Sequence, residues 1–484
     1  MEQKFDFGIV GLGVMGKNLL YNMADHGYSV IGLDLDATKA QSLESGATNG
    51  TTVKGVTNAE EFVKALSTPR RITLLVPAGN PVDAVAKSLL PYLDKGDIII
   101  DGGNSHYTDT LRRVKEMAVQ GIHFMGMGVS GGEKGARFGP SIMPGGDLEA
   151  YNHIKPLLEA VSAKVNGEPC TAYMGKDAAG HYVKMVHNGI EYAIMQAISE
   201  VYDVLKNGHG YTNAALHDLF VKWNDGKLKS FLVEITRDIF AFKDPDTGND
   251  LVDMILDKAG AKGTGKWTSQ DAMDQGVPIP GIDMAVALRT ISAYKDERVQ
   301  AAKLYAPVVS KIAIPKDVFA KQIEEAFFLT MIICYAQGLS LLVKASEELQ
   351  MDIPLKDVVK IWRGGCIIRS TLLEDFYQAY TKNPHLTNIL LDEGIASLVK
   401  QSWDGLRAVI SAATGSGIAV AVLQTSLAYL ESYTSANMPT NLIQAQRDYF
   451  GSHTYQRIDK TGIFHTEWES DAEAKADLAD LNSK

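Results

Sequence analysis

A glycine turn close to the start of the chain constrains the fold more than any other feature. Residues 7–39 read FGIVGLGVMGKNLLYNMADHGYSVIGLDLDATK, which predicts a strand, a turn, a helix and a second strand that ends on Asp34. In the turn, Gly11, Gly13 and Gly16 form the pattern GxGxxG. The first glycine permits a tight turn, the second lets the backbone approach a pyrophosphate, and the third allows close packing of helix and strand. The stretch therefore predicts a dinucleotide-binding βαβ unit.

Asp34 bears on which dinucleotide is bound. A carboxylate at this position can accept hydrogen bonds from an adenosine ribose, whereas the 2′-phosphate of NADP would lie against it. At an effective dielectric constant of about 20 and a separation of ~5 Å, each pair of like charges costs roughly 3 kcal/mol. Asp36 adds a second negative charge, and Lys39 offsets only part of the repulsion. NAD is therefore the favoured cofactor, with NADP as the alternative.

The length and the periodicity of the chain predict its domain organisation. A chain of 484 residues is expected to form two or three domains. Up to about residue 175, short apolar strands alternate with amphipathic helices; the strands are FGIVGLG, YSVIGLD, RITLLVPAG, GDIIIDGG and IHFMGMGVSGG. This alternation predicts a Rossmann-like, doubly wound parallel sheet with ligand sites at the carboxyl ends of its strands. Helical periodicity follows, and the last segment shows no clear periodicity. We expect a dinucleotide-binding α/β domain over 1–178, a large all-α substrate and dimerisation domain over 179–440, and a C-terminal tail over 441–484.

An internal echo within the helical part predicts a duplicated unit. The segment LHDLFVKWNDGKL begins at Leu216, and LKDVVKIWRGGCI begins at Leu355, a constant offset of 139 residues. Leucine, aspartate, tryptophan and glycine recur at matching positions, with Trp223 equivalent to Trp362. A repeat at a fixed offset indicates a duplicated helical unit, and a chance likeness between two amphipathic helices is the alternative.

Composition argues against several classes of partner. Hydrophobic residues make up 45% and charged residues 22% of the chain, which is typical of a soluble globular protein, and the net charge of −11 argues against a nucleic-acid surface. The most apolar run, Phe327–Val343, is shorter than the ~20 residues of a membrane span, so a buried core helix is expected. No secretory signal is visible, and Cys170, Cys334 and Cys366 form no CxxC pair. We expect a cytoplasmic protein with reduced thiols, no metal, and no nucleic-acid or membrane partner.

One predicted helix, GHYVKMVHNGIEY at 180–192, carries a set of polar residues on a single face. Lys184, His187, Asn188 and Glu191 stand at i, i+3, i+4 and i+7, so the face offers a potential base, two positioning groups and a potential acid. The alternative is an ordinary surface helix with a Lys/Glu face. The flanking residues are apolar, however, and leave little of the helix free to face water. We therefore predict a catalytic face.

Further long motifs extend the pattern along the chain. They are DGGNS at 101–105, GVSGGEKGARFGPSIMPGG at 128–146, KGTGKWT at 262–268 and QAQRDYFGSHTY at 444–455. Short Rossmann motifs recur in many enzymes, but this set, with the helix at 180–192, is specific in its order. On these residues the chain resembles the 6-phosphogluconate dehydrogenases, within the β-hydroxyacid dehydrogenase superfamily, along essentially its whole length.

The resemblance implies oxidative decarboxylation of 6-phosphogluconate to ribulose 5-phosphate and CO₂, a step of the pentose phosphate pathway. Lys184 would be the general base that takes the proton from the carbon-3 hydroxyl as hydride passes to the cofactor. Loss of CO₂ from the resulting 3-keto acid leaves an enediol, which Glu191 would protonate. For Lys184 to act near pH 7.5, its pKa must fall by about 3 units from ~10.4, which costs roughly 4 kcal/mol.

The resemblance also assigns the residues that would hold the substrate. Asn104, His187 and Asn188 would position the reacting hydroxyl and the nicotinamide. A glycine turn would bind the substrate carboxylate through Ser130, Gly131 and Gly132. The phosphate would be held by cations and hydrogen-bond donors at Tyr192, Lys262, Thr264, Arg289, Arg447 and His453. The last two residues, in the tail, come from the neighbouring subunit in the family, so a homodimer is implied.

Cofactor contacts are implied at the glycine turn and at the ends of later strands. The matching positions are Gly11, Leu12, Gly13, Val14, Met15, Gly16, Asp34, Leu35, Val76, Pro77, Ala78 and Asn104. Family members that prefer NADP usually carry Asn-Arg-Thr where this chain has Asp34, Leu35 and Asp36, and a lysine where it has Pro77. These differences remove positive charge or add negative charge, so NADP specificity does not carry over from the family.

Two alternative functions remain open at this point. A simpler β-hydroxyacid dehydrogenase would oxidise its substrate without decarboxylation, but such enzymes are typically shorter and lack the repeated helical unit and the tail. A dinucleotide-binding protein without catalytic activity would show damage at Lys184, Asn188 or Glu191, and all three residues are present.

Overall fold

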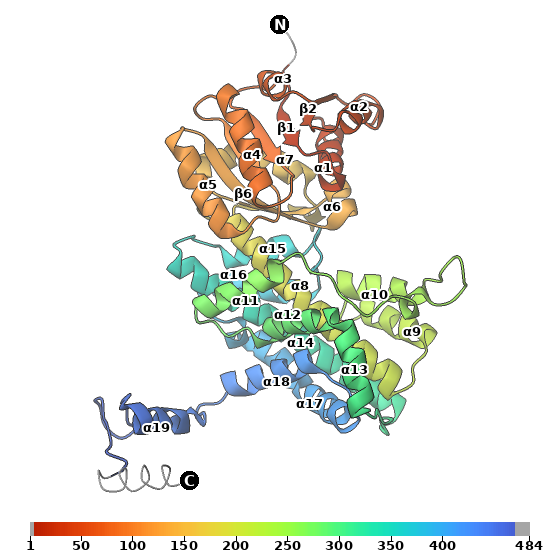
Figure 1. The fold of residues 1–484 in the computed structure, drawn as a ribbon, viewed down its shortest axis with the longest axis vertical. Helices are drawn as coiled ribbons and strands as arrows, with labels where there is room; N and C mark the ends of the chain where they lie inside the picture. Colours follow the sequence, from red (N-terminus) through yellow and green to blue (C-terminus); the bar gives the residue numbers. More distant parts are fainter. Residues whose placement is uncertain (1–3, 470–484) are drawn as a thin grey trace. The chain divides into compact units, whose positions relative to one another are not determined.

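A computed structural model describes residues 4–469 of the chain. The chain divides into two compact units, Met1–Leu427 and Ala428–Lys484 (Figure 1). The first unit begins with a sheet and its covering helices and continues as a large set of helices, which confirms the predicted α/β part followed by an all-α part. The predicted boundaries at 178/179 and 440/441 stay predictions.

The α/β part is built on one mainly parallel sheet. Its strands are β1 Phe7–Val10, β2 Val30–Leu33, β3 Val53–Val56, β4 Arg71–Leu74, β5 Ile98–Asp101, β6 His123–Ser130 and β7 Ser141–Gly145. Within residues 4–469 they form a seven-stranded sheet in the order β3-β2-β1-β4-β5-β6-β7, and only the β6–β7 pair is antiparallel. The strand order reverses between β1 and β4, which is the switch point where such sheets bind dinucleotides.

Some strands escaped prediction from the sequence. The edge strand β3 reads VKGV and is mostly half-buried, and β7 reads SIMPG, with a proline and a glycine that disfavour strands. Each is held by its neighbour, β3 by parallel pairing with β2 and β7 by antiparallel pairing with β6. A small hairpin of β8 (Lys164–Val165) and β9 (Glu168–Pro169) was also not predicted. Pairing with a neighbour here outweighs weak local propensity.

Both faces of the sheet are buried because alternate strand residues point to opposite sides. Ile98 and Ile100 belong to one core cluster with Leu19, whereas Ile99 belongs to a second cluster with Val82. Helices therefore cover the two faces, as Figure 1 shows. They are α1 Val14–Asp25, α2 Ala37–Ser45, α3 Ala59–Lys64, α4 Asn80–Leu89, α5 Tyr107–Val119, α6 Gly132–Phe138 and α7 Leu148–Val161.

The helical part is organised around two long helices, α8 and α14, which pack against each other. Of the described helices, α14 alone is long and apolar enough to cross a membrane, and 89% of its most apolar 18-residue window is buried. This burial agrees with the predicted core helix. The helices are α8 Ala179–Asp203, α9 Asn213–Asn224, α10 Phe231–Ala241, α11 Thr264–Asp274, α12 Pro280–Ala293, α13 Lys295–Tyr305, α14 Lys316–Glu348, α15 Leu355–Trp362, α16 Leu372–Lys382, α17 Glu393–Gly415 and α18 Ala421–Tyr433.

The predicted repeat corresponds to two similar helix pairs. α9 packs on α10, and α15 packs on α16. Trp223 and Trp362, the equivalent tryptophans, are both buried. The segments that lead into the second helix of each pair also touch each other, because Ser230 and Ser370 form an antiparallel bridge. The two copies thus meet within one residue of equivalent positions, which favours duplication over chance likeness.

The second unit contains α19 (Thr440–Gly451), where the sequence showed no clear periodicity. Its chain is organised by the buried carboxylate of Asp448, which accepts hydrogen bonds from the backbone N–H of Thr454 and Thr466 and from Trp468 Nε1. One carboxylate thus orders a segment that has little apolar core of its own. The three cysteines of the chain all lie in the first unit, buried and free.

Candidate active site

The three glycines of the turn between β1 and α1 each meet the requirement predicted for them. Gly11 has φ 94°, and an added Cβ would lie 2.5 Å from the carbonyl oxygen of Leu75. At Gly16 a Cβ would lie 1.9 Å from the carbonyl oxygen of Gly11. At Gly13 it would meet no described atom within 4 Å. The backbone at Gly13 is therefore open to a ligand, and the turn fits the pyrophosphate of a dinucleotide.

Asp34 follows β2 and faces this turn. One carboxylate oxygen accepts a hydrogen bond from the backbone N–H of Leu12 at 2.7 Å, and the other accepts from the N–H of Asp36 at 2.9 Å. Lys39 Nζ lies 3.9 Å from Asp34. The neighbouring Leu35 is 94% exposed. The acid is thus fixed beside the glycine turn, with one weakly placed lysine as its counter-charge.

Two further loops end at the same edge of the sheet. Val76, Pro77 and Ala78 follow β4, and the exposed Asn104 follows β5. The loops touch, because a Cβ added at Gly103 would lie 3.2 Å from the carbonyl oxygen of Val76. In the first turn of α1, Val14 is exposed and Met15 is half-buried. The structure therefore brings the predicted cofactor positions to one edge of the sheet.

Lys184 lies in the first half of α8, where this helix packs on the end of β6. The contact is close, since a Cβ added at Gly128 would lie 2.4 Å from Lys184 Cβ. The side chain of Lys184 is only 7% exposed. Burial lowers the pKa of Lys184 from its usual range, although the nearby Glu191 carboxylate opposes this shift. Burial thus moves Lys184 toward the neutral form that a general base requires, without removing its influence as a cation on its neighbours.

Glu191 and His187 extend the same face of α8. Burial raises the pKa of Glu191, and the cations Lys184 and Arg289 oppose the shift. His187 Nδ1 lies 3.8 Å from Glu191 Oε2 and 3.2 Å from Asn188 Oδ1. Burial and the charge of Lys184 hold the pKa of His187 well below its usual value, so this imidazole is neutral. We assign its proton to Nδ1, because that nitrogen faces two acceptor oxygens.

The glycine turn after β6 meets this face. Ser130 Oγ lies 3.2 Å from His187 Nε2 and is buried. With the proton of His187 on Nδ1, the Ser130 hydroxyl donates to Nε2. Gly131 has φ 125° and Gly132 has φ 62°, conformations that favour glycine. The turn can therefore present backbone N–H groups to an anion without a side chain between them and the anion.

Three of the predicted phosphate residues are brought together on the helical side. The Arg289 guanidinium lies 3.5 Å from the ring centroid of Tyr192, and a Cβ added at Gly265 would lie 2.5 Å from that ring. Thr264, buried beside Gly265, is the first residue of α11. Lys262 is exposed on the preceding loop. Arg447 and His453 belong to the second unit, so their part in this site stays a prediction.

Contacts within the helical part explain this arrangement. Thr268 Oγ1 donates to the carbonyl oxygen of Met185 at 2.9 Å, which fixes α11 against α8. Gly189 permits the approach, because a Cβ there would lie 2.7 Å from the Thr268 side chain. Trp362, from the second copy of the repeat, packs edge-on against His187 with ring centroids 5.6 Å apart. The indole was singled out in the sequence only as a repeat position, and the repeat gave no sign of its contact with the site.

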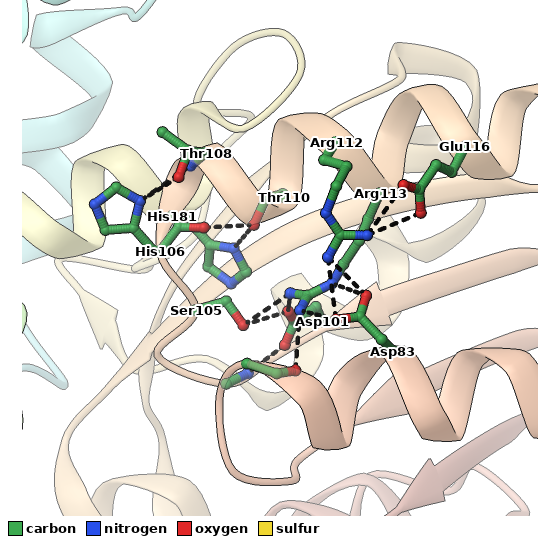
Figure 2. A network of polar contacts seen from close by, with 12 residues as sticks. Asp83, Asp101, Ser105, His106, Thr108, Thr110, Arg112, Arg113, Glu116 and His181 are labelled. Atoms are coloured by element: carbon green, nitrogen blue, oxygen red, sulfur yellow. Dashed lines mark hydrogen bonds and ion pairs between the residues drawn. The ribbon is translucent and has the colours of Figure 1, made fainter.

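A polar network around Arg113 joins the loops that follow β4 and β5, and none of its labelled residues was predicted as part of the site (Figure 2). Arg113 is 1% exposed, although α5 reads as an ordinary charged helix. A signal was present in the spacing, because Thr110, Arg113 and Met117 fall on one buried face of α5. A buried arginine among apolar positions marks a paired charge.

Comparisons with known proteins agree over nearly the whole chain. Residues 6–188 match the family model of the NAD binding domain of 6-phosphogluconate dehydrogenase, and residues 180–468 match that of the 6-phosphogluconate dehydrogenase C-terminal domain. The chain is 53% identical to an NADP(+)-dependent, decarboxylating 6-phosphogluconate dehydrogenase of Bacillus subtilis (strain 168), over 96% of this chain and 99% of that protein. It is 49% identical to the decarboxylating 6-phosphogluconate dehydrogenase of Escherichia coli (strain K12), with the same coverage.

A solved structure supports the same relationship. The Plasmodium falciparum 6-phosphogluconate dehydrogenase, described in its apo form, with its cofactor NADP+ and with its substrate 6-phosphogluconate, is 43% identical. The TM-score is 0.92, and the match covers 96% of this chain and 100% of that one. The likeness thus extends through both the sheet and the helices.

Proposed function

The chain belongs to the 6-phosphogluconate dehydrogenase family, and from this membership we propose how its residues divide the reaction. The reaction is the oxidative decarboxylation of 6-phosphogluconate to ribulose 5-phosphate and CO₂, coupled to reduction of a nicotinamide dinucleotide. When bound, the nicotinamide accepts hydride from carbon 3 of the substrate. The remaining steps are proton transfers and positioning, and these belong to the protein.

Lys184 takes the proton of the carbon-3 hydroxyl. This assignment is supported by the burial of the amine and the consequent fall in its pKa, since a general base must be unprotonated when substrate reacts. As CO₂ leaves the 3-keto acid, Lys184 returns its proton to the carbon-3 oxygen, which gives an enediol. Glu191 then donates a proton to the carbon that lost the carboxylate while Lys184 takes the proton of the enediol hydroxyl, and ribulose 5-phosphate is formed. A pKa raised by burial suits Glu191 to that role.

The remaining site residues hold the substrate at its two ends. Ser130, Gly131 and Gly132 bind the carboxylate, while Asn104, His187 and Asn188 position the reacting hydroxyl. Such positioning contributes several kcal/mol, because the reaction becomes effectively unimolecular. The phosphate is held by Tyr192, Lys262, Thr264 and Arg289, with Arg447 and His453 from a second copy of the chain. The enzyme is accordingly a homodimer and, on its composition, cytoplasmic and without nucleic-acid or membrane partners.

The observation that carries this proposal is the pairing of Lys184 and Glu191 on one face of α8, with burial moving their pKa values toward each other. The test mixes the protein with 6-phosphogluconate and NAD or NADP and follows both reduced cofactor and released CO₂. Equal amounts of the two products are expected. Reduction without CO₂ would instead indicate a simple β-hydroxyacid dehydrogenase, and neither product would indicate a protein without this activity.

NAD is the cofactor that the charges favour. The Bacillus subtilis relative is named NADP(+)-dependent, and the Plasmodium falciparum enzyme was solved with NADP+. In this chain Asp34 is fixed at the end of β2 and Asp36 follows it, so a 2′-phosphate would face two carboxylates and the single Lys39. We therefore place NAD ahead of NADP.

A double substitution tests this cofactor preference. Asp34→Asn with Leu35→Arg is expected to move the ratio of kcat/KM toward NADP by at least ~100-fold, about 2.7 kcal/mol. Asparagine keeps an oxygen for the Leu12 N–H, and the exposed position of Leu35 leaves room for arginine. Leu35→Gln is the matched control and should leave the ratio unchanged. A wild-type enzyme that prefers NADP, or a double variant that does not shift, would show that these residues do not read the ribose.

A further inference from the structure

Arg113 uses its whole guanidinium to join groups from several segments (Figure 2). Nε donates to Asp83 Oδ1 at 2.8 Å, and Nη2 donates to Asp83 Oδ2 at 2.9 Å and to the carbonyl oxygen of Gly79 at 3.0 Å. Nη1 lies 3.4 Å from Ser105 Oγ and 3.5 Å from Asp101 Oδ2. Hydrogen bonding to Arg113 contributes most to lowering the pKa of Asp83 to about 2. Because every nitrogen of the guanidinium has a partner, Arg113 holds these segments in a fixed position relative to one another.

Arg113 contacts the loop after β5 through Asp101 and Ser105. Asp101 is completely buried, and its carboxylate accepts from the N–H of Gly103 at 3.0 Å and from the hydroxyl of Ser105 at 2.6 Å. These bonds fold the loop around the carboxylate and leave Asn104 exposed at its tip. The position of Asn104 therefore depends on where Asp101 and Ser105 are held.

Arg113 also contacts the loop after β4, through the carbonyl oxygen of Gly79. Gly79, whose carbonyl oxygen accepts from Arg113, comes directly after Val76, Pro77 and Ala78. The two loops already touch near the sheet, since a Cβ added at Gly103 would lie 3.2 Å from the carbonyl oxygen of Val76. The two loops therefore touch at Val76 and Gly103, and Arg113 links them a second time at Gly79 and Ser105.

The helix that carries Arg113 also contacts the helix that carries Lys184. Thr110 Oγ1 lies 2.7 Å from Nδ1 of the buried His181, one turn before Lys184 on α8. Figure 2 shows Thr110 and His181 to the left of Arg113 and Asp83 to its right. α5 therefore contacts both the loops that are proposed to bind the nicotinamide and the helix that carries the general base.

We propose that Arg113 is a positioning residue that fixes the loop Val76–Gly79 against the loop Asp101–Ser105 and so aligns the nicotinamide half of the cofactor with Lys184. This inference rests on the proposed function, because the contact of these loops with the nicotinamide is part of that proposal. Arg113 acts through the two loops and is not proposed to touch substrate or cofactor. Its effect should be confined to the nicotinamide end, since the glycine turn that takes the pyrophosphate has no bond to Arg113 among the described contacts.

The test compares Arg113→Lys with Arg112→Met. Lysine keeps the charge but cannot reproduce the planar fork that spans Asp83, Gly79 and Asp101. Arg112 is the matched control, because it directly precedes Arg113 on α5 and binds the same Asp83 at 2.9 Å, but its own side chain is exposed. Binding of NADH and of ADP-ribose, which lacks the nicotinamide, is measured by calorimetry, and kcat is measured with 6-phosphogluconate.

For Arg113→Lys we expect NADH to bind ~5- to 10-fold more weakly and kcat to fall ~10- to 100-fold, with ADP-ribose affinity within ~2-fold of wild type. Arg112→Met should match wild type in all three measurements. Ser105→Ala, which removes one link between Arg113 and Asp101, should shift NADH binding in the same direction but by less. If the lysine variant is less stable, weaker binding of NADH with unchanged binding of ADP-ribose in Ser105→Ala would still support the proposal.

Equal weakening of NADH and ADP-ribose, or loss of the fold in Arg113→Lys, would overturn the proposal and make Arg113 a purely structural residue. Wild-type behaviour of Arg113→Lys would overturn it as well. These outcomes are distinct from failure of the proposed function. That failure would appear in the wild-type enzyme, as an absence of cofactor reduction with 6-phosphogluconate, whatever the variants bind.

Discussion

Replacing Lys184 with methionine is expected to lower kcat by at least ~10³-fold, about 4 kcal/mol, because the amine proposed to take the hydroxyl proton is then missing. Methionine fills much of the space of the lysine stem, which packs closely against Gly128, so the fold should be kept. The measurement is steady-state turnover with saturating 6-phosphogluconate and cofactor, together with a thermal melt.

Lys184→Arg is the matched control for charge. Arginine keeps a cation on α8 but is not deprotonated at any ordinary pH. If Lys184 served only to attract the anionic substrate, arginine would preserve turnover. We expect the arginine variant to be as inactive as the methionine variant, and turnover within ~10-fold of wild type in either would contradict the role of a base.

Replacing Glu191 with glutamine should produce a different defect. Steady-state turnover should fall by ~10²- to 10³-fold, because glutamine cannot donate a proton to the enediol. Hydride transfer precedes this step, so a single turnover should still form reduced cofactor at a rate within ~10-fold of wild type. Stopped-flow absorbance of the reduced nicotinamide, compared with release of ribulose 5-phosphate, separates the two steps.

Glu191→Asp is the companion variant, since it keeps an acid on a shorter side chain. Partial recovery of turnover in aspartate over glutamine is expected. If Glu191→Gln slowed the hydride burst as severely as it slowed steady-state turnover, the residue would act before decarboxylation, and its assignment as the late acid would be wrong.

The glycine turn shows how far local sequence can specify a site. The GxGxxG spacing fixed a different requirement at Gly11, Gly13 and Gly16, and the structure meets each one: a left-handed φ, an open backbone and close packing. These requirements are local, so a short stretch of sequence contains them. The polar face of α8 was equally accessible, because helical spacing alone places Lys184 and Glu191 on one side.

The missed features depend on contacts between distant segments. β7 forms from a proline- and glycine-containing stretch because β6 offers it a partner. Helical spacing separates Arg113 from its exposed neighbour Arg112, but its partners Asp83 and Asp101 come from separate segments, and no local pattern names them. Trp362, on α15, meets His187, on α8, although the two residues are far apart in the chain. No local pattern specifies such meetings.

The phosphate residues fall between these cases. Tyr192, Thr264 and Arg289 are scattered in the chain, and only the resemblance to a known family grouped them before the structure. The structure places Arg289 over Tyr192 and packs Gly265, beside Thr264, against the same ring. Arg447 and His453 are predicted to come from a second copy of the chain, so the structure of one chain does not test their place in the grouping.

The central claim is that Lys184 reacts as a neutral amine, and the pH dependence of hydride transfer tests it most directly. The rate of the first turnover is measured from roughly pH 6 to pH 10 in wild type and in Lys184→Met. Because burial lowers the pKa of Lys184, the wild-type rate should fall as pH drops through an apparent pKa below the usual ~10.4, and the slope should be that of one proton. Lys184→Met should show only a slow residual rate without that acid limb, whereas the same limb at near wild-type rate in the variant would contradict the account.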